Sequence, residues 1–253
     1  GRNLIINGAM QVAQRGTSLS SYSSGNDVKV LDRWKTAPVT AGTWTLSQES
    51  DAPDGFSNSL KFLCTTANSS LSVNSNLGIN QLFEGLNLTS LAKGTSSAKS
   101  LTLSMWVKSN KTGTYVAELF DSNNSRSISA TYTISSSDVW EYKTIVFVGD
   151  TSGALTFDNT QAMRLTLWLV AGTNYTSGTL ATSWESSVGG NRAVGQINLA
   201  DTLNNYFSIT GVQLEAGSVA TPFEYRQYGQ ELALCQRYYQ STYDYLAGDT
   251  PAS

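Results

Sequence analysis

The feature that most constrains the fold is an alternation of apolar and polar residues that recurs along the chain. In residues 101–108, LTLSMWVK, every odd position is apolar, and in residues 164–169, RLTLWL, the leucines again fall on one face. Successive side chains of a β-strand point to opposite faces, so such runs predict antiparallel sheets with one apolar and one polar face. Two sheets of this kind bury their apolar faces by packing against each other.

Short segments of the same kind, separated by turn residues, fill most of the remaining chain. The turns include Pro-Asp-Gly at 53–55, Lys-Thr-Gly at 111–113 and Gly-Gly-Asn at 189–191. Many short strands at such spacing predict an all-β fold, a two-sheet antiparallel jelly-roll sandwich. Further strands are expected at 3–6, 11–15, 28–35, 43–48, 60–65, 71–74, 113–121, 127–134, 142–148 and 206–215.

Two segments depart from the alternation. Residues 82–91 indicate a short helical turn or loop between strands. Residues 229–241 predict a short C-terminal α-helix, which carries an apolar stripe at helical spacing: Tyr228, Leu232, Cys235 and Tyr239. A helix of about a dozen residues is marginal alone, so we expect it to dock on the sandwich or on another chain.

These elements divide the chain into two parts. Residues 1–222 are expected to form the sandwich, and residues 223–253 the C-terminal helix and tail. Within the tail, residues 247–253 are polar and are expected to be a linker or a free end. The chain begins at Gly1 without Met, so a fragment or a processed product is expected.

The composition excludes several classes of function. Histidine is absent, which removes Ser-His-Asp and Cys-His catalysis and the usual zinc and non-haem iron ligand sets. The net charge of −3 leaves no basic footprint for nucleic acid, and no apolar run reaches membrane length. The two cysteines, Cys64 and Cys235, are expected to be buried free thiols, with a long-range disulfide as the alternative.

Both ends of the chain resemble bacteriophage proteins. Residues 3–16, NLIINGAMQVAQRG, followed by LDRW at 31–34, resemble the start of many phage tail-fibre and virion-fibre domains. The closing segments ITGVQLEAG at 209–217, TPFEYR at 221–226 and ELALCQRYY at 231–239 are similar to a segment that recurs in phage structural proteins.

The middle of the chain resembles a different class. Residues 101–109, with Gly113–Tyr115 and Trp140 after them, resemble the sandwich core of carbohydrate-binding modules. Together the resemblances imply a host-attachment or capsid-surface fibre on the virion, usually homotrimeric, with a lectin-like sandwich.

A structural calcium is a weaker expectation, and no other cofactor is expected. Carbohydrate-binding modules of this type often hold calcium near the first and last strands, with an acidic residue in the last strand. Here residues 208–212 read SITGV, and no carboxylate follows until Glu215. The acidic turns at 51–54 and 121–124 also offer oxygen ligands of the kind that calcium prefers.

Trp106 and Trp168 are the strongest candidates for a binding site. By parity each points away from the aliphatic face of its strand; Trp106 shares a face with Thr102, Ser104 and Lys108, and Trp168 with Arg164, Thr166 and Val170. A large aromatic ring on a polar face needs a partner, which is a sugar ring, another subunit or a covering loop. Stacking surface beside hydroxyls and a guanidinium is what sugar recognition requires.

Trp44, Tyr175 and Trp184 are further glycan-binding candidates, with local packing as the alternative. Tyr175 and Trp184 lie in the long polar stretch 172–205, which has little strand character. Loops of such length inside a compact domain are usually functional or disordered. The candidate glycan ligands are therefore Trp106, Trp168, Arg164, Trp44, Tyr175 and Trp184.

Catalysis by carboxylates is the remaining enzymatic route, because glycoside hydrolysis needs two facing acids. Three pairs are near in sequence, and the last two fall in turns: Glu118 with Asp121, Asp138 with Glu141, and Glu49 with Asp51. We expect a non-catalytic protein, with a depolymerase as a less favoured alternative.

The patterns together predict a phage receptor-binding domain that binds a host cell-surface polysaccharide and contacts other virion proteins. The tyrosine-rich C-terminal region is expected to stabilise a homotrimer, because tyrosine suits interfaces. The alternative from another class is a purely structural fibre, collar or capsid-decoration protein without a ligand site. Neither nucleic-acid binding nor membrane insertion is expected.

Overall fold

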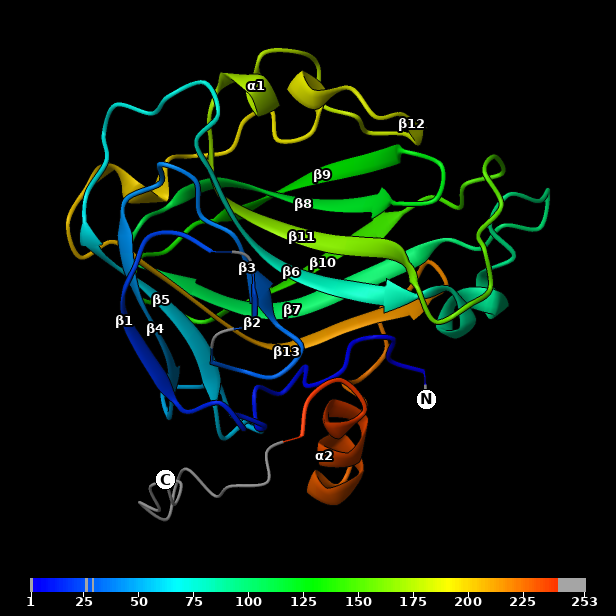
Figure 1. The fold of residues 1–253 in the computed structure, drawn as a ribbon, viewed down its shortest axis with the longest axis horizontal. Helices are drawn as coiled ribbons and strands as arrows, with labels where there is room; N and C mark the ends of the chain where they lie inside the picture. The colour runs from blue at the N-terminus through cyan, green and yellow to red at the C-terminus, as the bar shows by residue number, and fades with distance from the viewer. Residues whose placement is uncertain (1, 26, 29, 241–253) are drawn as a thin grey trace, which may run out of the picture.

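The computed structural model describes residues 2–25, 27–28 and 30–240, and shows two antiparallel sheets packed face to face (Figure 1). Sheet A contains, in spatial order, β1 (Ser18–Tyr22), β4 (Thr43–Glu49), β5 (Ser59–Thr66), β13 (Tyr206–Ala216), β7 (Leu101–Ser109) and β10 (Glu141–Phe147). Sheet B contains β12 (Glu185–Ser186), β9 (Arg126–Ile134), β8 (Gly113–Asp121), β11 (Gln161–Ala171), β6 (Asn76–Glu84), β3 (Lys35–Thr36) and β2 (Asp27–Val28). The predicted all-β jelly-roll sandwich is confirmed.

The alternation in the sequence decides which side chains enter the core. The odd-numbered residues of β7, from Leu101 to Val107, are all buried between the sheets, and so are Leu165, Leu167 and Leu169 of β11. A β-bulge between Trp168 and Val170 turns Val170 into the same core, so it does not share the outward face with Trp168 as parity predicted.

Trp44 belongs to this core, which contradicts its expected role as a glycan ligand. Its side chain is 0% exposed and its ring meets Phe62 edge-on, at 6.5 Å between centroids. The indole Nε1 donates a hydrogen bond of 2.8 Å to the carbonyl oxygen of Ala41, so its polar atom is satisfied inside the protein.

The strand β6 differs from its prediction. The sequence favoured a strand at 71–74 and a helical turn or loop from residue 82, whereas β6 spans Asn76–Glu84 and the 3-10 helix η1 spans Gly85–Leu91. The core-facing positions of β6 include a polar residue, Gln81, which hides the alternation. Its amide bonds both the N–H (2.7 Å) and the C=O (2.9 Å) of Ile6, as a neighbouring strand would.

The N-terminal segment is irregular, so the strands expected at 3–6 and 11–15 are wrong. Asn7 and Met10 have left-handed backbone conformations, at φ 61° and 57°, which no regular strand accommodates. Asn7 also satisfies the local backbone, since its Oδ1 accepts from the N–H groups of Gln11 and Val12, each at 2.9 Å. The strand at 28–35 is reduced to short β2 and β3, and β1 was not predicted.

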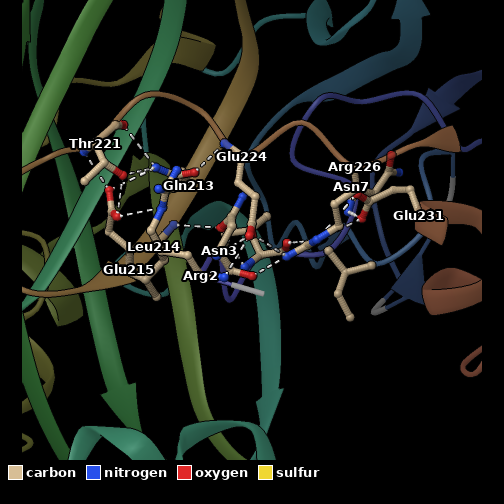
Figure 2. A network of polar contacts seen from close by, with 12 residues as sticks. Arg2, Asn3, Asn7, Gln213, Leu214, Glu215, Thr221, Glu224, Arg226 and Glu231 are labelled. Atoms are coloured by element: carbon tan, nitrogen blue, oxygen red, sulfur yellow. Dashed lines mark hydrogen bonds and ion pairs between the residues drawn. The ribbon is translucent and has the colours of Figure 1, made fainter.

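The C-terminal helix α2 (Tyr228–Gln236) packs on this N-terminal segment rather than standing alone (Figure 1). Figure 2 shows Arg226 reaching the first residues of the chain, where it donates to the carbonyl of Ile5 at 2.9 Å. The N–H of Asn3 donates to Glu224 at 2.7 Å, and that of Asn7 donates to Glu231 at 2.5 Å. Residues 224–236 are thus tied to the N-terminal segment.

Both cysteines are free thiols, as expected. Cys64 lies in the main core, and Cys235 of α2 packs with Ile6 and Val12. Burial raises the pKa of Cys235 to about 12.

Among the residues that the structure describes, no helix has the length and apolarity that crossing a bilayer requires. The tail predicted at 247–253 lies outside the described residues, and so do Tyr243 and Tyr245 of the tyrosine-rich C-terminal region.

Candidate functional site

A groove of about 280 Å³ lies on the outward face of sheet B, the face that the core does not use. Strands β3, β6 and β11 form its floor, and the segment after β11 forms its wall. That segment contains the short helix α1 (Thr173–Thr176) and the 3-10 turn η2 (Gly189–Asn191), which Figure 1 shows next to each other at one end of the molecule.

Strand register places the polar residues of the floor in rows. Arg164, Thr166 and Trp168 point outward from β11 and lie opposite Leu82, Asn80 and Gly78 of β6. Lys35 of β3 lies beyond Asn80 in the same row. These side chains share a face because alternate residues of adjacent strands align across a sheet.

The floor is fixed by hydrogen bonds between these rows. The hydroxyl of Thr166 donates to Oδ1 of Asn80 at 2.7 Å and accepts from Nε of Arg164 at 3.1 Å. The Asn80 amide nitrogen donates to the carbonyl of Gly78 at 3.3 Å. Hydroxyl, amide and guanidinium groups therefore present fixed donors and acceptors to the groove, as ligand orientation requires.

A buried carboxylate supports the wall. Glu118 of β8 is 0% exposed and accepts hydrogen bonds from Arg192 Nε (2.7 Å) and Nη2 (3.1 Å) and from Trp168 Nε1 (3.0 Å). Bidentate pairing of a guanidinium with a carboxylate fixes its plane as well as its position. Arg192 is thereby held over the ring of Trp168, 5.3 Å from the ring centroid.

Trp168 is covered more than the sequence predicted. It is only 4% exposed, because Tyr175 of α1 packs against it with ring centroids 5.1 Å apart. Of the three partners that the sequence left open for this indole, a covering loop is the one found. The half-buried ring of Tyr175, whose hydroxyl accepts from Asn76 Nδ2 at 3.3 Å, is the more accessible aromatic surface of the groove.

Gly78 keeps space open beside the indole. It lies opposite Trp168, and a Cβ at this position would come within 2.8 Å of the methyl group of Thr166. Any side chain here would therefore enter the groove or displace Thr166.

The electrostatics of the groove are dominated by cations. Arg164, Arg192 and Lys35 line it, and among the described residues no carboxylate does, since Glu118 lies beneath. Burial holds the pKa of the Arg164 guanidinium below its usual value. The negative charge of Glu118 offsets this only in part, and the like charge of Arg192 lowers the pKa further. Both guanidinium groups also lie near the ring of Phe120, at 5.0 and 5.3 Å from its centroid.

The structure brings together three of the six predicted ligands: Arg164, Trp168 and Tyr175. Trp106 instead lies on the outward face of sheet A, on the opposite side of the sandwich, half-buried beside Tyr142 at 5.3 Å between ring centroids. Trp184 lies apart from the groove, where its Nε1 donates to the carbonyl of Val148 at 2.8 Å.

Sequence reasoning missed Arg192, Asn80 and Lys35. The parity of β11 correctly placed Arg164 and Thr166 beside Trp168, but β6 was not recognised as a strand, so Asn80 carried no signal. Arg192 follows the turn at 189–191 and is not part of an alternating pattern. Only its pairing with Glu118 in the structure reveals its role.

The carboxylates considered for catalysis are engaged by other groups. Glu118 lies under the wall of the groove, and Asp121 forms a buried ion pair with Lys93. The hydroxyl of Tyr206 donates to Asp138, and Lys143 pairs with Glu141. Within the described ranges, no cluster of three His, Cys, Asp or Glu side chains is suited to a metal ion; calcium binding stays a prediction.

No family model matches the sequence, and no curated protein matches it. Solved structures that are similar include the enzymatically active domain of tailspike protein 4 from bacteriophage CBA120, with a TM-score of 0.43 and 13% identity over 85% of this chain and 21% of that one. The carbohydrate-binding module TmCBM61, in complex with β-1,4-galactotriose, gives a TM-score of 0.39 and 12% identity over 85% of this chain and 99% of that one.

The tripod from the baseplate of bacteriophage Tuc2009 is also similar, with a TM-score of 0.37 and 14% identity over 88% of this chain and 57% of that one. The chain spans about a fifth of the CBA120 tailspike chain, at 21%. Similar structures thus include both phage tail proteins and carbohydrate-binding modules. At these TM-scores no function transfers to this chain, so its function has to follow from the groove.

Proposed function

We propose that this chain is a non-catalytic glycan-binding domain of a phage virion, and that the groove on sheet B binds a polysaccharide of the host cell surface. The observation that carries the proposal is the combination of an aromatic wall with a hydrogen-bonding floor in one open groove. Tyr175 offers an apolar ring to the face of a sugar, while Asn80, Thr166 and Arg164 offer partners for its hydroxyl groups.

The groove is built before any ligand arrives. Glu118 fixes Arg192, and Trp168 supports Tyr175 from below, so few rotamers have to be frozen on binding. A single shallow site binds weakly, and a homotrimer would raise the avidity by about 10²–10⁴ where the geometry permits. Placement on the virion surface and trimeric assembly are part of the proposal, supported by the fibre-like sequences at both ends of the chain.

The test compares one tyrosine on each face of the sandwich. Tyr175→Ala removes the ring from the groove, and Tyr142→Ala removes the ring beside Trp106 on sheet A. On a glycan array and on host cells, Tyr175→Ala is expected to weaken binding about 3- to 10-fold, the size of one aromatic contact, and Tyr142→Ala to leave it unchanged.

Three outcomes would count against the proposal. A larger loss with Tyr142→Ala would move the site to sheet A and to Trp106. If the unmodified protein binds neither glycans nor host cells, the alternative of a purely structural fibre, collar or capsid-decoration protein is favoured. Release of reducing sugar from a bound polysaccharide would instead identify a depolymerase.

A further inference from the structure

The charges of the groove indicate more than general sugar binding. Three cationic side chains line it, Arg164, Arg192 and Lys35, and of these Arg192 is paired with the buried carboxylate of Glu118. The groove is therefore cationic, although the chain as a whole has a net charge of −3. A neutral sugar gives no reason for this local excess of positive charge.

Arg164 is one of two groove cations that have no ionic partner among the described residues. Among the residues that the structure describes, it forms no ion pair within 4.0 Å, and only its Nε makes a hydrogen bond, to Thr166 at 3.1 Å. The other two guanidinium nitrogens keep their donors for a ligand. The group is half-buried, partly removed from water and close to a like charge, so an arriving anion is bound more strongly than at an open surface.

Lys35 adds a second available charge on the same floor. It is half-buried at the position across from Asn80, and its ammonium group forms no hydrogen bond or ion pair with any described residue. Arg164 and Lys35 lie on strands that flank β6, so an anionic group above Asn80 would have one cation on either side.

We infer that the groove selects acidic saccharides, and that Arg164 binds an oxyanion carried on a sugar ring while Tyr175 stacks on the ring. A planar carboxylate, as in a uronic acid, matches the fork of a guanidinium with two parallel hydrogen bonds. A sulfate ester offers the same oxygens in tetrahedral arrangement. This inference rests on the proposed function of the groove.

The experiment uses the whole chain and three soluble probes: galacturonic acid oligomers, the same oligomers with their carboxyl groups reduced, and a sulfated neutral glucan. Binding is followed by isothermal titration calorimetry and on an array that contains both acidic and neutral bacterial polysaccharides. The protein is expected to bind acidic glycans preferentially, and their affinity is expected to fall as salt rises, because salt screens exposed charges.

Variants then locate the anion. Arg164→Gln is expected to weaken acidic-glycan binding about 10- to 100-fold, the range of a lost charge-assisted pair. Arg164→Lys keeps the charge but loses the fork, so it is expected to restore part of the affinity for sulfate and less for carboxylate. Lys99→Gln removes one exposed charge outside the groove and is the matched control, expected to change nothing. Thermal unfolding of each variant verifies that it folds.

The outcomes separate this inference from the proposed function. Preferential binding of neutral glycans, weakened by Tyr175→Ala but not by Arg164→Gln, overturns the inference and leaves the proposed function intact. If Arg164→Gln and Lys99→Gln weaken acidic-glycan binding equally, the effect comes from net charge, and the inference is also overturned. Failure to bind any acidic or neutral glycan contradicts both. Preference for the sulfated probe over the galacturonate probe assigns the oxyanion as a sulfate ester.

Discussion

The outward faces of the two sheets carry similar residues in different surroundings. Each has a tryptophan with a tyrosine beside it. Each also has a carboxylate that accepts hydrogen bonds from a cationic side chain and from an indole N–H. On sheet B the carboxylate is Glu118, which is 0% exposed, whereas on sheet A it is Asp51, whose side chain is 56% exposed while it bonds Lys108 and Trp140. The difference arises because the segment after β11 covers sheet B and makes a wall there.

Burial changes how strongly the same kinds of hydrogen bond and ion pair hold their side chains in place. In the groove, water is largely excluded from the Glu118 pair, so its hydrogen bonds position Arg192 and Trp168 firmly. On sheet A, solvent screens the pair of Asp51 with Lys108, and such pairs contribute little. Functional geometry is therefore expected on sheet B and not on sheet A, although each face has an outward-pointing tryptophan.

The largest expected difference is in the two carboxylates. Glu118→Ala is expected to lower the free energy of unfolding by about 3 kcal/mol, because it leaves a partly buried guanidinium and an indole N–H unpaired. Asp51→Ala is expected to lower it by less than about 1 kcal/mol. Urea denaturation of both variants measures the two changes in the free energy of unfolding. Equal changes would show that burial does not distinguish the two carboxylates.

The two indoles give the next test. Trp168→Phe keeps most of the ring but loses the hydrogen bond to Glu118, so a loss of about 1 kcal/mol is expected. The Nε1 of Trp106 donates to no described residue, and Trp106→Phe is expected to cost less than about 0.5 kcal/mol. The measurement is again equilibrium unfolding; a costlier Trp106→Phe would reverse the comparison.

A smaller effect is expected from lysines on the two faces. Lys35→Gln removes a groove cation and is expected to weaken acidic-glycan binding about 2- to 5-fold, the size of one partly screened charge. Lys61, which lies over the Tyr206 ring on sheet A, is the matched position, and Lys61→Gln is expected to have no effect. Binding is measured by titration calorimetry at two salt concentrations. If both variants weaken binding, the effect comes from the overall charge of the protein and not from the position of Lys35 in the groove.

The smallest effect concerns pH. Partial burial raises the pKa of Asp51, but hydrogen bonds from Lys108 and Trp140 outweigh burial and hold this pKa below its usual value. A lowered pKa in the folded state stabilises the protein above the unfolded-state pKa of about 4, and this contribution is lost as the pH falls through the folded value.

The melting temperatures of the unmodified protein and of Asp51→Asn are thus expected to differ slightly at pH 7 and to converge as the pH falls below about 4. A gap that stays constant over this range would mean that ionisation of Asp51 does not stabilise sheet A.

Much of the fold could be predicted because its information is local. The alternation gave the boundaries of β7 closely and the central part of β11, together with the direction in which Trp106 and Trp168 point, and the run 113–121 coincides with β8. The predictions failed where a long-range contact overrides the local pattern. Gln81 is buried in β6 only because Ile6 supplies backbone partners for its amide. The irregular N-terminal segment likewise takes its hydrogen-bond partners from residues 224–231 (Figure 2).

The candidate site was only half predictable for the same reason. Parity placed Arg164 and Trp168 on one outward face, but it could not tell an exposed indole from one covered by Tyr175. The hydrogen bonds of Glu118 join residues 50 and 74 positions away, and no sequence periodicity encodes such a separation.

The sequence by itself determined that the chain makes a two-sheet sandwich and which side chains of β7 and β11 face outward, because a strand repeats every two residues and burial follows that repeat. Only the tertiary structure decided which outward face becomes a groove. A wall requires a distant loop to be held against the sheet, and the buried contacts of Glu118 with Arg192 and Trp168, together with the packing of Tyr175 on Trp168, hold it there.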